Sequence, residues 1–276
     1  MLSRIRLGAY DSEGHIHCDY GIPPHLGGYE LISATGLEPP TSVISYSEYA
    51  MVPGGRYHSS TQGIRNITLR IGLHPAPGSG QTVLDMRRAF FAAVPSDREL
   101  DIRLWNDGVH EFRIDGYLES IESDYFTQEP VLIVSLVCPI PEFRRPSQTR
   151  LDDLNPGALN IDYAGDIPAG FMLTFHINEA LNNTLYVENE TTGNRVEVQD
   201  SWSRNDRVRV RTHAGARLVH YTDDGGNITG PLLGRTEVIN DWPMLVPGEN
   251  RLLVGAKANS SRVTYDIWYP ELFRGF

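Results

Sequence analysis

The sequence predicts a mainly β protein of two domains, with one helix in the first domain. Three observations lead to this prediction. Apolar and polar residues alternate in many short runs, as they do on half-buried strands. The 276 residues include 26 glycines and 18 prolines, which suits a chain with many turns. Residues 139–157 are rich in proline and charge and lack an apolar period, so we place a boundary near residue 146, between domains 1–145 and 146–276.

The N-terminal domain begins with irregular sequence and then predicts an arm. Glycine and proline interrupt the first forty residues, and only YELISATGL, residues 29–37, has the pattern of a strand. Residues 42–73 predict two long strands joined by a polar, glycine-rich tip at VPGGR. The second of these strands alternates well, with its apolar residues on one face. Two such strands would form an arm.

Residues 81–94 predict the single helix. Thr82 precedes it and Asp85 follows three residues later, which is the spacing of a capping box. A proline marks its end. The apolar residues with helical spacing are Val83, Met86, Phe90 and Val94.

Two further strand signals complete this domain. Residues 98–121 predict two strands around Asn106-Asp107-Gly108, because Asp-Gly accepts the positive φ of a tight hairpin turn. The stretch PVLIVSLVCP, residues 130–139, is apolar on both faces. It therefore predicts a central strand that is covered on both sides.

The second half is a series of short strands with turn signals about every 8–12 residues, the pattern of a sandwich or barrel. One pair turns at ETTGN, residues 190–194. The last segment, VPGENRLLVGAKANSSRVTYDIWYPELF, has two alternating apolar runs on either side of a polar turn. It predicts a β-hairpin that closes the domain.

Charge and composition exclude several classes of function. The formal net charge of −11 argues against a general nucleic-acid-binding surface, which needs an excess of Lys and Arg. No apolar stretch approaches the ~18 residues of a membrane span, and no signal peptide is visible, so we expect synthesis in a reducing cytoplasm. The two cysteines, Cys18 and Cys138, have apolar or aromatic neighbours and are expected to be buried free thiols.

No motif indicates catalysis. His15, His17 and Cys18 are of metal-ligand type, but no second pair at zinc-like spacing exists, and we favour a solvated segment. GSGQT, residues 78–82, lacks the lysine of a phosphate-binding loop and predicts a flexible loop before the helix. No nucleophile elbow is present, and acidic turns on a β protein usually face solvent. We therefore predict no catalytic, cofactor-binding or metal-binding residue and no enzyme activity, and the chain suggests a part of an assembly.

A rival hypothesis is a carbohydrate-binding β-sandwich that recognises a cell-surface glycan. Trp202 and Trp242 are the candidates for a platform on which a sugar ring would stack. The alternative role for these residues is burial in a core or an interface, which is the default for tryptophans beside apolar residues.

Several stretches, taken in order, resemble the distal tail protein (Dit) family of siphophages. They are PGGRYHSSTQGIRNITLRIGL, then FRIDGYLESIESDYFTQEPVLIVSLVCPIPEF, then NPGALNIDYAGDIPAGFMLTFHI, then VENETTGNRVEVQ, and finally WPMLVPGENRLLV with VTYDIWYPELF. The resemblance covers nearly the whole chain and depends on the order of diffuse motifs. The start of the second half, YAGDIPAGF, is an imperfect copy of the family pattern.

The resemblance implies a structural role in the virion. Family members form a ring, usually a homo-hexamer, at the tip of the phage tail. The ring joins the tail tube protein to the tail hub or fibre protein, and in some phages it also holds receptor-binding proteins. DNA passes through its channel without specific binding, and no membrane is involved. The implied fold is a barrel-like N-terminal β domain with a helix and an arm, followed by a galectin-like C-terminal β-sandwich.

Within this picture the arm is the candidate for contacts around the ring, because strand edges pair readily with strands of a neighbouring subunit. The candidate contact residues are Tyr49, Met51, Arg56 and Tyr57.

Overall fold

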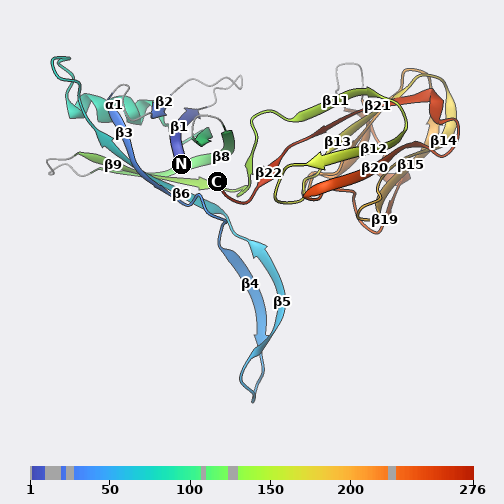
Figure 1. Ribbon diagram of the computed structural model, residues 1–276, viewed down its shortest axis with the longest axis horizontal. Helices are drawn as coiled ribbons and strands as arrows, with labels where there is room; N and C mark the ends of the chain where they lie inside the picture. Colours follow the sequence, from blue (N-terminus) through green and yellow to red (C-terminus); the bar gives the residue numbers. More distant parts are fainter. Residues whose placement is uncertain (1, 10–19, 23–27, 107–109, 124–129, 223–227) are drawn as a thin grey trace. The chain divides into compact units, whose positions relative to one another are not determined.

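The computed structural model describes residues 2–9, 20–22, 28–106, 110–123, 130–222 and 228–276 (Figure 1). The chain divides into two compact units, with Met1–Pro146 and Arg274–Phe276 in unit 1 and Ser147–Phe273 in unit 2. The described residues form antiparallel strands in both units and one α-helix in unit 1, which confirms the mainly β prediction.

Unit 1 is built on one antiparallel sheet with the strand order β2-β1-β7-β8-β9-β6-β3. The bounds are β1 (Leu2–Ala9), β2 (Tyr20–Ile22), β3 (Tyr29–Thr35), β6 (Arg65–Leu73), β7 (Glu99–Asn106), β8 (His110–Ser123) and β9 (Val131–Cys138), and the short β10 (Phe143–Arg144) pairs with β8. The strands β2 and β3 at the two ends of this order are not paired with each other. The barrel-like closure implied by the resemblance is therefore not found, and the described strands form an open sheet.

The helix α1 spans Val83–Ala93 and confirms the predicted capping box. The Thr82 hydroxyl accepts a hydrogen bond from the Asp85 N–H at 3.2 Å, and Asp85 Oδ2 accepts one from the Thr82 N–H at 2.9 Å. Met86 and Phe90 are buried, and Phe90 packs against Tyr29 of β3, with ring centroids 6.0 Å apart. The helix thus covers part of the apolar face of the sheet.

Two expectations for this unit were wrong in part. The strand β6 was assigned to the arm, within residues 42–73, but it lies between β9 and β3 in the sheet, because its apolar residues need a core to cover them. The strand β9 is central as predicted, but only one of its faces is fully covered. Leu132 and Val134 are buried, while Ile133 between them is 40% exposed.

Unit 2 is a sandwich of two antiparallel sheets. The six-stranded sheet has the order β11-β21-β13-β16-β17-β18, and the five-stranded sheet has the order β12-β20-β14-β15-β19. The bounds are β11 (Thr149–Leu154), β12 (Gly157–Tyr163), β13 (Met172–Ile177), β14 (Leu181–Asn189), β15 (Asn194–Trp202), β16 (Arg207–Arg211), β17 (Leu218–Thr222), β18 (Ile228–Pro231), β19 (Thr236–Ile239), β20 (Gly248–Ala256) and β21 (Val263–Tyr269), with two short 3₁₀ helices at Leu233–Arg235 and Ser260–Arg262. The short β22 (Leu272–Phe273) belongs to neither of these two sheets.

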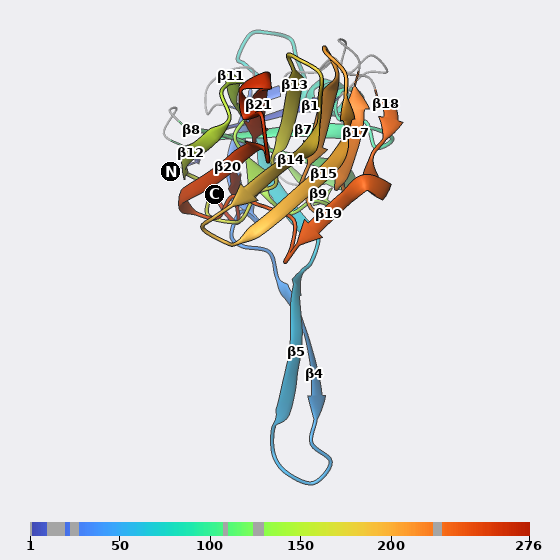
Figure 2. The same ribbon diagram turned by 90° about the vertical axis from the view of Figure 1, so that its right-hand side faces the viewer.

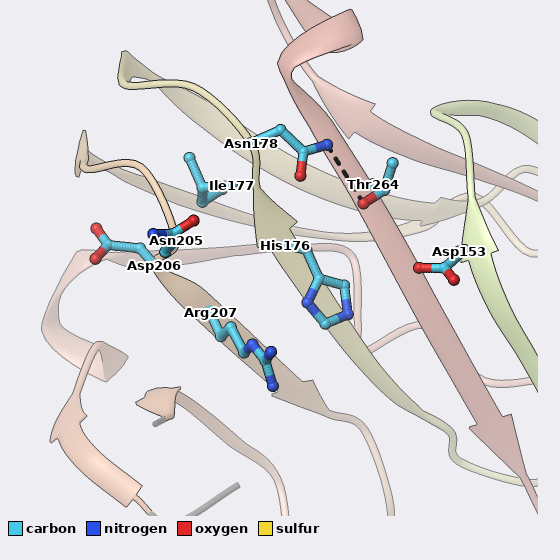
Figure 3. A pocket seen from close by; sticks show the side chains of 8 residues that line it. All are labelled: Asp153, His176, Ile177, Asn178, Asn205, Asp206, Arg207 and Thr264. Carbon is cyan, nitrogen blue, oxygen red and sulfur yellow. Dashed lines mark hydrogen bonds between the residues drawn. The ribbon is translucent and has the colours of Figure 1, made fainter. Parts of the chain in front are cut away.

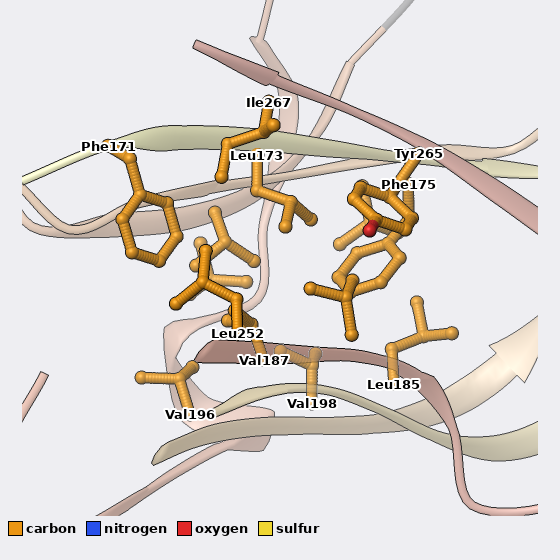
Figure 4. Close-up of a cluster of buried hydrophobic side chains, with 14 of the residues drawn as sticks. Phe171, Leu173, Phe175, Leu185, Val187, Val196, Val198, Leu252, Tyr265 and Ile267 are labelled. Atoms are coloured by element: carbon orange, nitrogen blue, oxygen red, sulfur yellow. The ribbon is translucent and has the colours of Figure 1, made fainter. Parts of the chain in front are cut away.

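Alternating residues of the two sheets meet in one apolar core, shown in Figure 4. Leu173 and Phe175 of β13 and Ile267 of β21 face Val187 and Val198 of the other sheet, and all five are buried. The sandwich therefore places the intervening residues of each strand on its outer faces.

The predicted closing hairpin is wrong. Its two strands, β20 and β21, lie in different sheets: β20 pairs with β12 and β14, and β21 pairs with β11 and β13. The polar connection between them turns through Asn259, which has a φ of 56°, and the 3₁₀ helix that follows. It crosses from one sheet to the other, because both apolar faces must point into the same core.

Candidate functional site

The two strands β4 (Ser42–Glu48) and β5 (Gly55–Gln62) form a separate hairpin, here called the arm. They pair with each other and with no other strand of the described chain, as Figures 1 and 2 show. The tip is closed by a hydrogen bond from the Tyr49 N–H to the Gly54 carbonyl at 3.2 Å. At the base, the Gly63 N–H donates to the Thr41 carbonyl at 3.0 Å. The arm is thus a complete element that is inserted between β3 and β6.

Every residue of the two arm strands is exposed, including large apolar ones. The four candidate residues Tyr49, Met51, Arg56 and Tyr57 are all exposed, and Met51 at the tip is 96% exposed. An isolated two-stranded hairpin is marginally stable in water, and it presents unpaired strand edges on both sides. This exposure makes the arm the strongest candidate for a contact with another chain.

The two faces of the arm differ in composition. Ile44 and Tyr46 alternate onto one face, and Tyr57 lies opposite Tyr46 in the register. Val43 lies on the other face opposite Thr61, where its neighbours are serines. The arm therefore has an aromatic face and a mainly polar face.

The base of the arm is held by a buried arginine, Arg65, which is 2% exposed. Its guanidinium donates to the Gly36 carbonyl at 2.7 Å, the Glu38 carbonyl at 2.6 Å and the Arg274 carbonyl, and Nε donates to the Pro141 carbonyl at 2.7 Å. Three segments that are far apart in the sequence meet at this one side chain. Arg65 thus fixes the segment that leads into the arm and the returning C-terminus.

The neighbouring Gly36 is required by the backbone at this point. Its φ is +81°, and a Cβ atom there would lie 1.9 Å from the Asn66 carbonyl oxygen. Any side chain would therefore collide with β6 and strain the backbone. The segment that leads into the arm at Gly36 is consequently packed closely against the backbone of β6.

One of the two tryptophans predicted as a sugar platform is buried. Trp202 is 2% exposed, and its indole N–H donates to the Asn183 carbonyl at 2.7 Å, so no ring face is available for stacking. Trp242 is partly buried against the same core. The platform at Trp202 is therefore excluded by burial in the sandwich.

Charged side chains also cluster on unit 1, around Asp101 on β7. Its carboxylate oxygens lie 2.7 Å from Arg103 Nε and 2.6 Å from Arg113 Nε, although Asp101 is 1% exposed. Burial raises the pKa of this carboxyl group against the opposing effect of Arg103. Each charged side chain of this cluster has a partner of opposite charge. The cluster therefore has the character of a structural ion-pair network.

The remaining sequence predictions concern cysteines, metals and membranes. Cys138 is a buried free thiol, as predicted, and burial raises its pKa to about 12. His15, His17 and Cys18 lie outside the described residues. In the described part of the chain, no group of three His, Cys, Asp or Glu side chains is arranged to hold a metal ion. None of the helices described has the length and apolar character that crossing a bilayer requires.

Residues 164–269 match the family model for the siphovirus-type tail component, C-terminal domain. This part of the chain therefore has the domain of a siphovirus-type tail component, and the place of such a component is the virion. The fold of the whole chain is similar to the crystal structure of the Dit protein of phage SPP1, described as a paradigm of the hub adsorption apparatus in phages that infect Gram-positive bacteria. The identity is 13%, the match covers 98% of this chain and 99% of that one, and the TM-score is 0.69. The family model therefore covers the C-terminal part of the chain, and the fold of the whole chain is similar to that of the SPP1 Dit protein.

Two structures of the phage P2 baseplate in its activated conformation, with Ca and with Sr, contain a chain that also matches. The identity is 10% in both, with TM-scores of 0.48 and 0.47. The match covers 97% and 96% of this chain and 98% and 97% of those chains. No match was found among curated protein sequences. The fold is that of a phage tail protein.

Proposed function

We propose that copies of this chain form a closed ring, a homo-hexamer, at the tip of the phage tail. The ring joins the tail tube protein to the tail hub or fibre protein, offers a place for receptor-binding proteins, and leaves a channel through which DNA passes without specific binding. The role is structural and involves no catalysis and no membrane.

The observation that carries this proposal is the exposed arm. A hairpin whose strands pair only with each other, with exposed tyrosines on one face, gains stability when a neighbouring subunit covers it. A contact between an arm and a different surface of the next copy is heterologous, and repeated rotation of such a contact closes into a ring.

The charge of the chain supports the passage of DNA. A net charge of −11 per copy gives a ring a strongly negative total charge, which repels the phosphate backbone. DNA would then move through the channel without adhering to its wall.

The experiment is removal of the arm at its closed base. Residues 42–62 are replaced by a two-residue Asn-Gly turn, because the hydrogen bond between Thr41 and Gly63 holds these ends together. Light scattering should then give the mass of a single shortened subunit, about 2 kDa below the 30.9 kDa of the full chain, while the full chain gives a multiple of 30.9 kDa. Circular dichroism should show that the shortened chain remains folded. A folded, shortened chain that still assembles into the same number of copies would show that the arm does not build the ring.

A further inference from the structure

A polar pocket of about 480 Å³ lies on unit 2 (Figure 3). Its walls come from four strands that are consecutive in the six-stranded sheet, β11, β21, β13 and β16, and from the turns that join them. Its volume lies in the range of about 300–1,000 Å³ that is usual for small-molecule sites. The lining residues are Asp153, His176, Ile177, Asn178, Asn205, Asp206, Arg207 and Thr264.

The lining is almost entirely polar. The one apolar residue, Ile177, is 1% exposed and belongs to the apolar core, so it offers the pocket little surface. Most pockets for drug-like or lipid ligands are instead lined by apolar and aromatic side chains. The ligand of this pocket must therefore be a polar one.

The walls are held in place by hydrogen bonds of the backbone. The Asn205 N–H donates to the Ile177 carbonyl at 2.8 Å, and the Asn178 N–H donates to the Arg262 carbonyl at 2.8 Å. Asp206 Oδ2 accepts from the Ser203 N–H at 2.7 Å and fixes the turn before β16. Such a site needs little reordering when a ligand arrives, which favours binding.

Two wall residues have a backbone conformation that is uncommon for residues other than glycine. Asp153 has a φ of 51° and Asn205 has a φ of 70°. Residues in this region cost some stability, and they gather at ligand sites more often than elsewhere. The Asp153 N–H donates a hydrogen bond to Asp266 Oδ1 at 2.9 Å. The backbone conformation of Asp153 therefore also helps to position the carboxylate of Asp266, which is next to the pocket.

That carboxylate orients the histidine of the pocket. Asp266 Oδ2 lies 2.8 Å from His176 Nε2. Burial opposes ionisation of Asp266, but the hydrogen bonds from Asp153 and His176 outweigh it and lower the pKa of this carboxyl group. An ionised Asp266 accepts a hydrogen bond from His176 Nε2–H, so Nδ1 is the ring nitrogen that is left for a ligand.

The amide side chains of the pocket remain available to a ligand. The Asn205 amide has no hydrogen bond within the described residues, and the Asn178 amide has only a long one, of 3.5 Å, to the Thr264 hydroxyl. Amides and hydroxyls both donate and accept hydrogen bonds, as sugar hydroxyl groups do. Carboxyl groups at Asp153 and Asp206 disfavour an anion, and Arg207 disfavours a cation.

We propose that this pocket binds a neutral carbohydrate, whose hydroxyl groups pair with the amides of Asn178 and Asn205 and with His176. This proposal is independent of ring formation. It places the glycan on the outer face of the six-stranded sheet, at residues other than the two tryptophans that the sequence suggested.

The test is saturation-transfer difference NMR on the full chain, which works for a monomer and for a ring alike. The probes are D-glucose, D-galactose, N-acetyl-D-glucosamine and, as a charged comparison, inorganic phosphate. The variants are Asn178→Ala and Asn205→Gly, since glycine accepts the φ of 70° at residue 205 without strain. The matched controls are Asn160→Ala, at an exposed position on the other sheet, and Asn259→Gly, where φ is 56°.

The expected result is saturable transfer to at least one sugar, weakened about tenfold in the two pocket variants and unchanged in the two controls. Three results would overturn the proposal: no saturable transfer to any sugar, sugar binding that the pocket variants do not weaken, or binding of phosphate alone.

Discussion

Arg65 is the residue on which unit 1 depends most clearly. Its five N–H donors serve four carbonyl groups from three segments, and the guanidinium carbon lies 4.4 Å from the centroid of the Phe143 ring. A side chain of similar size without donors would leave those buried carbonyls unpaired.

We expect Arg65→Met to lower the free energy of unfolding by about 3–5 kcal/mol, as loss of a buried charged partner typically does. The measurement is urea denaturation of the full chain. Arg70→Met on the same strand is the control, because Arg70 is exposed, and it should change stability by less than about 0.5 kcal/mol. Equal effects of the two substitutions would refute the role given to Arg65.

Two histidines, the buried His220 and the half-buried His213, make the stability of unit 2 sensitive to pH. His220 is 3% exposed, and among the described residues neither of its ring nitrogens has a hydrogen-bond partner. Burial, with Arg209 and Arg211 nearby, lowers the pKa of His220 in the folded chain, and His213 shifts the same way for similar reasons. The unfolded chain therefore binds protons at a pH where these folded side chains remain neutral. These two histidines therefore lower the free energy of unfolding as the pH falls below about 6.5, the usual pKa of histidine.

Replacing His220 by Phe should make the stability of the chain less dependent on pH. Denaturation midpoints at pH 7.5 and pH 5.5 should differ less in His220→Phe than in the parent chain, because one group that gains a proton on unfolding is gone. His58→Phe on the exposed arm is the control and should leave the pH dependence unchanged. A pH dependence that is the same in all three chains would contradict the burial argument.

At the scale of single elements, the aromatic face of the arm should contribute more to assembly than the mainly polar face. Replacing Tyr46 and Tyr57 by Ser removes the aromatic pair from one face, whereas Val43→Ser changes the mainly polar face. Tyrosine is enriched among the residues that dominate interfaces, so the double substitution should weaken assembly by about tenfold or more. Sedimentation velocity over a range of concentrations measures this. If Val43→Ser weakened assembly equally, the two faces would not differ.

Local signals were predictable from the sequence and long-range pairing was not. The capping box at Thr82 depends on residues three apart, and it is present. The closing hairpin was wrong because alternation shows which residues of β20 and β21 face a core, but not which strands they pair with. For the same reason the alternating residues of β6 could not be told from those of an arm strand.

For the candidate sites too, local features were predictable from the sequence and long-range ones were not. Exposure of the arm was foreseeable from its polar, glycine-rich tip, which no apolar core could cover. The pocket on unit 2 was not foreseeable, because its side chains come from three strands, with Asp153, His176 and Thr264, and from a turn, with Asn205, and only the fold brings these together. Nothing in the local sequence separated Trp202, which is buried, from a tryptophan that faces solvent.

At the scale of the whole molecule, the proposed ring accounts for the exposed arm and the acidic charge together. An exposed arm is unfavourable for a monomer in water, and a high negative charge serves a channel for DNA. Both features become useful when several copies surround a central opening.

Electron microscopy of the purified full chain tests this account most directly. We predict ring-shaped particles with a central hole and six-fold symmetry, which disappear when residues 42–62 are replaced by a short turn. Isolated single subunits at every concentration and salt condition, with no rings, would contradict it.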